Sequence, residues 1–531
     1  MDMVLLIVFF VIVGLFVYRW STSTFDFFEK QNVPFVKPIP LVGGLWSFVT
    51  GKMNIIDTVS KGYHMFPDSR FSGLFTLYLP SYLIHDPELV KQITIKDFDH
   101  FMDRANNITP EMDPLLGRAL VFTNGSRWKH GRTGLSPAFT GSKMKNMFVL
   151  LSNYADAAMQ RLVEDAAGGT LEREMKDLFQ RLGNDVMTSI SFGVEIDSVH
   201  DPENEFFVSG KCLGTTSGLQ GLKVFLMSLF PLKLLPLLGL QIIPQKVIDF
   251  YEQTVAASIK NREMNNIVRP DFIHLLTLAR KNELKAEISD EKFNSAGYST
   301  VEEHFKTTDE GALQWTDMDI TAAAASFFFG GIETTTNLLC FVVYELSLNT
   351  EVQDRLRTEI DRVREESGNQ KLTYESIQKM KYLDMVVSET LRKWPPFGVL
   401  NRKCTKTYIM ENYDGTSAVV QKGEIISFSI NAIHRDPKYY PDPMRFDPER
   451  FSEENRPKLN PSAFLPFGSG PRNCIGSRLA LAQAKCFLYY LLAYFDVNIS
   501  PRTDVPIKLD NRSIGLNAKN GFWFQLIPRE R

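Results

Sequence analysis

The chain has 531 residues, and 59 Lys and Arg against 62 Asp and Glu leave a net charge of −3. Hydrophobic residues make up 44% and charged residues 23%, which excludes wholesale disorder. A general nucleic-acid binder normally carries a basic excess, so the near-neutral charge argues against that class. We expect a globular protein with a large core and no nucleic-acid partner.

Residues 3–18 form an uninterrupted apolar run, MVLLIVFFVIVGLFVY. At about 1.5 Å per residue, a helix of this length suits a thin endoplasmic-reticulum membrane. A cleaved signal peptide is the alternative, but it normally has basic residues ahead of the run, where this chain has Asp2. The sequence predicts an uncleaved membrane anchor over residues 1–20, with the remainder on the cytosolic side by the positive-inside rule.

Three prolines at positions 34, 38 and 40 and two glycines at 43 and 44 follow the anchor. Prolines at this density favour stiff extended backbone, which predicts a proline-rich linker over residues 21–45. From residue 46 to 531 there is no second linker and no repeat, and helical patterns dominate. We therefore expect one large domain, mainly α with small β-sheets, although the length alone would suggest about three domains.

Residues 223–243 form a second apolar stretch, KVFLMSLFPLKLLPLLGLQII. Pro231, Lys233 and Pro236 argue against a transmembrane helix here. Two interpretations stay open, a segment of the buried core and a surface loop that dips into the lipid interface.

A long helix is predicted from residue 317 onward. Thr316 is a suitable N-cap, and Asp319 completes a capping box. The helix continues through the string GGIETTT, residues 330–336, although each glycine inside a helix costs about 1 kcal/mol relative to alanine. A helix that retains such residues is either crossed closely by another helix or distorted for a functional reason.

Two further pairs of residues at helical spacing stand out. Trp128 and Arg132 are four residues apart and point the same way from a helix. Glu389 and Arg392 are three residues apart and share a helix face, and prolines 395 and 396 then end that helix. Taken alone, such an ion pair is a common surface feature of small energetic value.

The strongest signal is one cysteine, Cys474, in the string FLPFGSGPRNCIG. The five cysteines include no CxxC pair, so neither a zinc ribbon nor a disulfide framework is indicated. A helical pattern, SRLALAQA, follows directly, so Cys474 lies at a helix N-terminus, where the dipole and free N–H groups stabilise a thiolate. An arbitrary cysteine is more often a small buried hydrophobe, but a thiolate held this way can ligate a metal.

The string around Cys474 resembles F-x-x-G-x-R-x-C-x-G, the haem-binding signature of the cytochrome P-450 family. Other motifs of that family follow the same order along the chain: W-x-x-x-R at residues 128–132, [AG]-G-x-[DE]-T-[TS] at 330–335, E-x-x-R at 389–392 and PERF at 448–451. The strings RPDFIHLL, residues 269–276, and FLPFG, residues 464–468, resemble the insect microsomal enzymes of clan three, family nine.

The resemblance implies a cytochrome P-450 fold that encloses haem b (iron protoporphyrin IX) behind the transmembrane helix. Cys474 would be the axial thiolate and metal ligand, with Phe467 packed beside it. Thr334 and Glu333 would be the catalytic alcohol and acid, and Gly330, where alanine is commoner, would leave room over the haem. The remaining residues implied to bind the cofactor are Arg472, Gly470, Gly476, Trp128, Arg132 and Arg402. Glu389, Arg392 and Arg450 would form a structural charge network.

The implied activity inserts one atom of O2 into apolar small molecules such as xenobiotics, plant toxins, insecticides or endogenous lipophiles. No GxGxxG string is present, so electrons would come from an NADPH-dependent cytochrome reductase, with cytochrome b5 as an optional second donor. The expected location is the endoplasmic-reticulum membrane, with the catalytic domain in the cytosol. Candidates for the reductase-docking surface are Arg127, Lys129, Lys143 and Lys145. Candidates for the substrate pocket are Phe327, Phe328, Phe397, Val399, Leu400, Ile514 and Leu516.

Three other functions are weighed against this one. A P-450-like isomerase or dehydratase would keep the haem but not use O2, and such sequences usually lose the acid–alcohol pair or interrupt the cysteine loop. An esterase is disfavoured because GLSPA, residues 134–138, lacks the last glycine of G-x-S-x-G. The third is a membrane-tethered binding protein without a cofactor.

Overall fold

The computed structural model describes residues 2–106, 108–214, 241–281, 283–284, 298–299, 315–368, 370–513 and 515–529. The apolar stretch 223–243 therefore lies outside the described residues except for its last three, and Ile514 lies outside them as well. Of that stretch, Ile243 is buried in the core.

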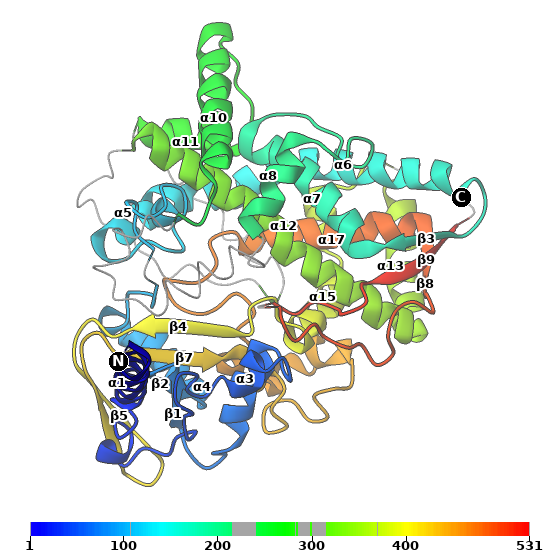
Figure 1. Cartoon of the computed structure of the whole chain (residues 1–531). Coiled ribbons are helices and arrows are strands. Elements are labelled where there is room, and N and C mark those ends of the chain that lie inside the picture. Colours follow the sequence, from blue (N-terminus) through cyan, green and yellow to red (C-terminus); the bar gives the residue numbers. More distant parts are fainter. Residues whose placement is uncertain are drawn as a thin grey trace.

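The described chain is mainly helical, with three small sheets (Figure 1). The helices are α1 (Asp2–Thr22), α2 (Trp46–Val49), α3 (Ile55–His64), α4 (Pro87–Lys91), α5 (Gly125–Leu135), α6 (Gly141–Ala166), α7 (Met175–Phe192), α8 (Glu205–Gly214), α10 (Gln245–Asn265), α11 (Phe272–Arg280), α12 (Asp317–Leu348), α13 (Thr350–Glu366), α14 (Tyr374–Gln378), α15 (Lys381–Lys393), α16 (Ile430–His434) and α17 (Ser477–Tyr494). The strands are β1 (Phe71–Thr76), β2 (Leu79–Ile84), β3 (Leu171–Glu174), β4 (Val399–Lys403), β5 (Tyr408–Glu411), β6 (Ser417–Val420), β7 (Ile425–Ser429), β8 (Phe495–Ile499) and β9 (Trp523–Pro528). The predicted class, one mainly α domain with small sheets, is confirmed.

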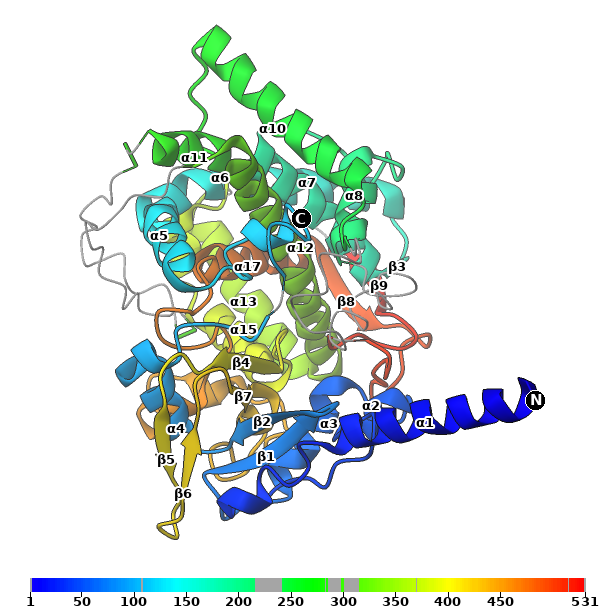
Figure 2. The same cartoon turned by 60° about the vertical axis from the view of Figure 1, so that its left-hand side comes forward.

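The helix α1 projects away from the rest of the molecule (Figure 2). Its span Met3–Thr22 is long and apolar enough to cross a membrane, and no part of its apolar window is buried against the protein, whereas Ser21 at its end is buried. Helix α12 passes the same test of length and composition, but 61% of its apolar window is buried, so it is a core helix. An apolar helix with no protein around it needs another apolar environment, which fits the predicted anchor.

The chain directly after α1 is packed onto the body. Phe28 is fully buried and meets Phe75 and Tyr82, each with ring centroids 5.2 Å apart. Phe35 forms a β-bridge with Gly73 on β1. Much of the segment for which the sequence predicts a linker therefore belongs to the folded body, because its phenylalanines cover the first sheet.

The largest sheet has the strand order β1-β2-β7-β4, with β2 and β7 parallel and the other neighbours antiparallel. The other sheets are β3-β9-β8 and β5-β6, both antiparallel. The four-stranded sheet lies at one end of the molecule, and most helices lie at the other, around α12 (Figure 1).

The core helix α12 begins as the sequence predicts. The Thr316 hydroxyl accepts from the Asp319 N–H at 3.1 Å, and the Asp319 carboxylate accepts from the Thr316 N–H at 3.1 Å. This capping box satisfies two donors at the helix start. The helix then packs along α7 and contacts α10, α15 and α17, so the GGIETTT string lies deep within the helical part.

Candidate functional site

A tight loop places Cys474 directly ahead of α17. The Cys474 N–H donates to the Phe467 carbonyl at 2.9 Å, and the Asn473 N–H donates to the Gly470 carbonyl at 2.9 Å. The loop closes over Thr94, because a Cβ built on Gly470 would lie 1.8 Å from the Thr94 carbonyl oxygen. These contacts fix the cysteine backbone two residues before the N-cap of α17, Gly476.

The electrostatic surroundings of Cys474 combine two opposing effects. Removal from bulk water raises the pKa of the Cys474 thiol, whereas the Gly476 N–H and the charges of Arg132 and Arg104 lower that pKa. Although enclosed by protein, Cys474 keeps solvent-accessible surface, so its sulfur has room for a ligand. A metal ion would add the positive charge that a thiolate at this position needs.

Four arginines come together beside this loop: Arg104, Arg132, Arg402 and Arg472. Arg132 donates to the Asn473 carbonyl at 3.0 Å and to its side-chain oxygen at 2.7 Å. Arg472 donates to the carbonyls of Met102 and Thr123, each at 2.8 Å, and stacks over Trp128 at 4.2 Å.

This arginine cluster carries more positive charge than its surroundings neutralise. Arg472 forms an ion pair with Asp103 at 3.9 Å. Burial and the charge of Arg104 lower the pKa of Arg402 to about 9, and burial together with Arg104 and Arg402 lowers the pKa of Arg472 to about 8.

Buried donor atoms of the arginine cluster also lack acceptors. The Nε atoms of Arg104 and Arg402 and the Nη1 atom of Arg472 have no hydrogen-bond partner among the described residues. Repelling cations with unmade hydrogen bonds are costly unless an anion with several acceptor oxygens lies between them. The arginine cluster is therefore suited to a buried ligand that carries carboxylates.

Helix α12 passes close to the cysteine loop. A Cβ built on Gly476 would lie 4.0 Å from the Phe327 ring. A Cβ on Gly331 would collide with Met187 of α7 at 2.6 Å, but a Cβ on Gly330 would meet nothing within 4 Å. Gly331 thus serves close helix packing, the first of the two interpretations, while Gly330 borders open space.

The acid and the alcohol of α12 have separate partners. The Thr334 hydroxyl donates to the Gly330 carbonyl at 2.7 Å, one turn earlier. The Glu333 carboxylate faces α7, where it accepts from Gln180 at 2.8 Å and pairs with Lys176 at 3.1 Å.

The E-x-x-R residues form a buried pair. Arg392 donates to both carboxylate oxygens of Glu389, at 2.7 and 2.8 Å, and both side chains are fully buried. Arg392 also donates to the carbonyls of His434 and Pro443, and Arg450 lies 3.5 Å from Glu389. The three charged residues thus form the network that the sequence predicts.

His434 connects this network to the cysteine loop. Burial and the charge of Arg392 lower the pKa of His434 to about 3, so the imidazole is neutral. Its Nδ1 lies 3.1 Å from the Arg392 carbonyl, and its Nε2 accepts from the Leu465 N–H at 2.8 Å. A neutral imidazole can donate at one nitrogen and accept at the other, as both contacts require. The sequence analysis did not single out this residue.

The model of the cytochrome P450 family matches residues 33–524. The chain is also 39% identical over 529 residues to "Cytochrome P450 9e2" of Blattella germanica, covering 97% of this chain and 96% of the relative. The chain belongs to the cytochrome P450 family. It is 38% identical to "Probable cytochrome P450 9f2" of Drosophila melanogaster, with 98% of each covered, and 34% identical to "Cytochrome P450 6k1" of Blattella germanica, with 95% and 93% covered. The predicted likeness to family nine of the insects is confirmed.

Cytochromes P450 are monooxygenases that bind haem through a cysteine thiolate, and the donors present in this P450 fit that group. A haem carries two propionates, and the arginine cluster supplies the unpaired buried donors that two carboxylates would satisfy. The loop supplies one sulfur, the usual single thiolate ligand.

The sequence motifs missed Arg104, which joins the arginine cluster from the segment before α5. Arg104 donates to the Arg472 carbonyl at 3.3 Å. The adjacent Asp103 accepts from the Gly125 N–H at 2.7 Å. Only the pair of opposite charges at 103–104 marks this position in the sequence, and such pairs are common.

The residues predicted to line a substrate pocket divide into three groups. Phe328 is fully buried against Phe192 and Tyr251, and Leu516 is also core. Phe397 is 60% exposed. Leu400 lies beside the cysteine loop, since a Cβ on Gly468 would meet it at 3.3 Å, so Leu400 and Phe327 are the best-placed candidates.

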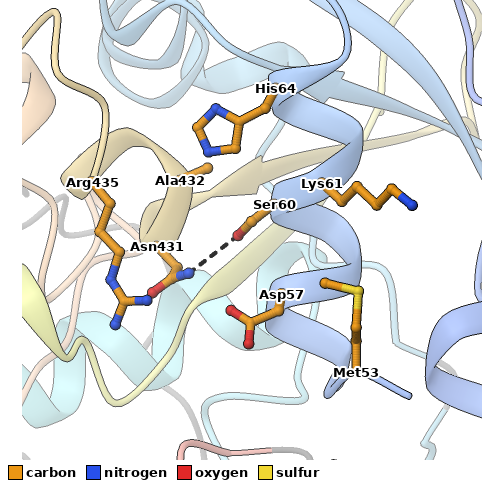
Figure 3. Close-up of a pocket in the computed structure, with 8 residues that line it drawn as sticks. All are labelled: Met53, Asp57, Ser60, Lys61, His64, Asn431, Ala432 and Arg435. Carbon is orange, nitrogen blue, oxygen red and sulfur yellow. Dashed lines mark hydrogen bonds between the residues drawn. The ribbon is translucent and has the colours of Figure 1, made fainter. Parts of the chain in front are cut away.

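Two cavities of the described structure contain none of the predicted site residues. One, of about 260 Å³, lies between α3 and α16 and includes Asn431, whose amide donates to Ser60 at 3.2 Å (Figure 3). Asp57 and Arg435 give this cavity a polar lining. The other, of about 540 Å³, lies between α6 and α7 and is bordered by several carboxylates. Neither is an apolar pocket next to Cys474.

The close contact of Gly470 with Thr94 gives a direct test of the loop. Gly470 has φ of +71°, and the added methyl group of Gly470→Ala would overlap the Thr94 carbonyl. We expect this variant to be recovered with little bound haem, measured as haem absorbance per protein.

Gly415→Ala is the matched control. Gly415 has a similar φ of +81°, but nothing lies within 4 Å of the added Cβ. This variant carries only the backbone strain of about 1 kcal/mol, so its haem content should be normal. Equal haem contents in the two variants would contradict the predicted loop contact.

Proposed function

We propose that this P450 oxidises apolar small molecules with electrons from an NADPH-dependent reductase, while α1 anchors it in the endoplasmic-reticulum membrane with its body in the cytosol. The arginine cluster beside Cys474 carries the proposal, because it suits the propionates of a haem whose iron the thiolate ligates. Trp128, stacked under Arg472, helps to hold the propionate region.

The proposed roles around the haem follow from these contacts. Cys474 would supply the thiolate that holds the haem iron, and Phe467 fixes the Cys474 backbone by accepting its N–H and would shield the sulfur. Gly470 lets the loop close over Thr94, and Gly476 is the N-cap of α17. When bound, the haem supplies oxygen activation, because thiolate donation favours cleavage of the O–O bond.

The proposed chemistry needs protons on the α12 side. The net reaction combines one substrate C–H bond, O2, two electrons and two protons, and it yields one hydroxylated product and water. Glu333, with a side chain 32% exposed, can collect protons from solvent. The Thr334 hydroxyl donates its proton to the Gly330 carbonyl, so its oxygen is left to accept a hydrogen bond from the space beside Gly330.

Two apolar side chains beside the cysteine loop support an apolar substrate class. Leu400 and Phe327 approach the cysteine loop from opposite elements, β4 and α12, and both are half-buried. Apolar walls with a few polar groups are typical of small-molecule sites. Relatives in families nine and six support an enzyme of this general kind.

The reductase surface is proposed around Lys129 of α5. Two other candidates are partly neutralised by the protein, because Arg127 pairs with Asp319 at 2.6 Å and Lys145 pairs with Glu375. Docking by a basic patch would make turnover sensitive to salt.

Turnover of the purified, membrane-reconstituted protein tests the proposal. Apolar compounds that shift the haem spin state should be hydroxylated only when reductase, NADPH and O2 are all present. Two results together would favour the isomerase or dehydratase instead. The protein would convert an organic peroxide without NADPH and O2, and no spin-shifting compound would give an NADPH-dependent product. The uninterrupted cysteine loop and the retained Glu333–Thr334 pair favour the monooxygenase.

A further inference from the structure

Two residues of α7 occupy both oxygens of the Glu333 carboxylate. Lys176 Nζ lies 3.1 Å from Oε1, and Gln180 Nε2 donates to Oε2 at 2.8 Å. Lys176 and Gln180 are four residues apart, so they share one face of α7 and reach α12 together. A carboxylate held at both oxygens has little freedom to rotate, so α7 determines where the acid points.

Lys176 has a second partner on a different element. Its Nζ donates to the Asn517 side-chain oxygen at 2.6 Å. Asn517 is itself fixed, because its amide donates to Ser513 at 2.6 Å and its carbonyl accepts from the Asp510 N–H at 2.8 Å. Lys176 therefore joins α12 to the turn between Leu509 and Ala518, which form a β-bridge.

The carboxylate of Glu174, a neighbour of Lys176 in the chain, has other partners. Glu174, two residues earlier, accepts from the Asp177 N–H at 2.7 Å and from the Phe522 N–H at 2.8 Å. The Lys176 and Glu333 side chains are 25% and 32% exposed, so solvent screens their attraction and the pair adds little to stability. Its importance is geometric rather than energetic.

We propose that Lys176 is a positioning residue that holds Glu333 and makes the position of the acid depend on the turn around Asn517. This inference rests on the proposed role of Glu333 in proton supply. Lys176 touches neither substrate nor haem in this account and acts only through Glu333.

The expected consequence is a change in how electrons are used. When protons arrive in the wrong place, O2 leaves as H2O2 after taking up two electrons and two protons, and the substrate is not oxidised. For Lys176→Met, we expect product per NADPH to fall about three- to tenfold, with a matching rise in H2O2. We call product per NADPH the coupling of the enzyme. Lys176→Arg, which keeps the charge, should retain at least about half of the coupling of the parent, and Asn517→Ala should lower the coupling about twofold.

The experiment compares these variants with Lys260→Met as the matched control. Lys260 is exposed on α10, and its replacement removes the same charge. All variants should keep the CO-bound absorption band of the parent, which shows that the thiolate site is intact. Thermal unfolding of the ferric holoenzymes is the check on the fold: because the pair adds little to stability, Lys176→Met and Glu333→Gln should unfold close to the temperature of the parent.

Two outcomes would overturn the proposal. In the first, Lys176→Met yields as much product per NADPH as the Lys260→Met control. In the second, Lys176→Met lowers coupling as much in a Glu333→Gln background as in the parent, so it does not act through Glu333. If Glu333→Gln alone couples like the parent, the proposed proton role of Glu333 fails first, so the two failures are distinguishable.

Discussion

Replacing Cys474 by alanine should abolish the CO-bound absorption band typical of thiolate ligation and remove all detectable NADPH-dependent oxidation. The loop offers one sulfur next to the arginine cluster, and no group of three or more metal-binding side chains exists elsewhere in the described chain. Without the thiolate, the electron donation that favours O–O cleavage is lost. The measurement is the difference spectrum between the reduced protein with CO and the reduced protein without CO, followed by product analysis.

Cys404→Ala is the matched control. Unlike Cys474, Cys404 is buried in the core beneath the first sheet, where its Sγ donates to the Lys406 carbonyl at 2.9 Å. Its loss should cost some stability and leave the absorption band in place. A Cys474→Ala protein that retained the parental band would disprove the assignment of the axial ligand.

Removing Arg392 should destabilise the protein by about 3–5 kcal/mol, because Glu389 would remain buried without its partner. Burial already raises the pKa of the Glu389 carboxyl, and Arg392 opposes that rise. This loss is a large fraction of the stability of a typical protein, so Arg392→Ala should yield little folded holoprotein. Chemical unfolding, followed by loss of the haem band, measures the difference.

A similar ion pair on the surface provides the control. Arg362 and Glu366 are four residues apart on α13, and both side chains are at least 60% exposed. Arg362→Ala should change the unfolding free energy by less than about 1 kcal/mol. Arg392→Lys, which keeps a charge but not two parallel hydrogen bonds, should fall between the two. If Arg392→Ala is as stable as Arg362→Ala, the network is not structural.

The sequence motifs predicted the parts of the site that depend on local spacing. The cysteine loop, the capping box at Thr316 and the pair Glu389–Arg392 each involve residues that are close in the chain. Their geometry follows from turn and helix periodicity, so the structure shows them as expected.

The contacts that the sequence could not predict join segments that are distant in the chain. Arg104 meets Arg472 across 368 positions, and Lys176 meets Asn517 across 341. No periodicity relates such pairs, because the packing of α5, α7 and the C-terminal strands determines them. The segment after α1 illustrates the same limit. Its prolines predict stiff backbone, but nothing in the sequence predicts that its phenylalanines cover the first sheet.

The packing of this segment has a mechanical consequence. Ser21 and Phe28 are buried within a few residues of the end of α1, so hardly any rotatable backbone separates the anchor from the body. With α1 in a bilayer, as proposed, the helix would act as a rigid stalk, and the tilt of the body above the membrane would be built into the chain. For the same reason, a shortened soluble chain should begin before Phe25, because a later start would strip the aromatic cover from β1 and β2.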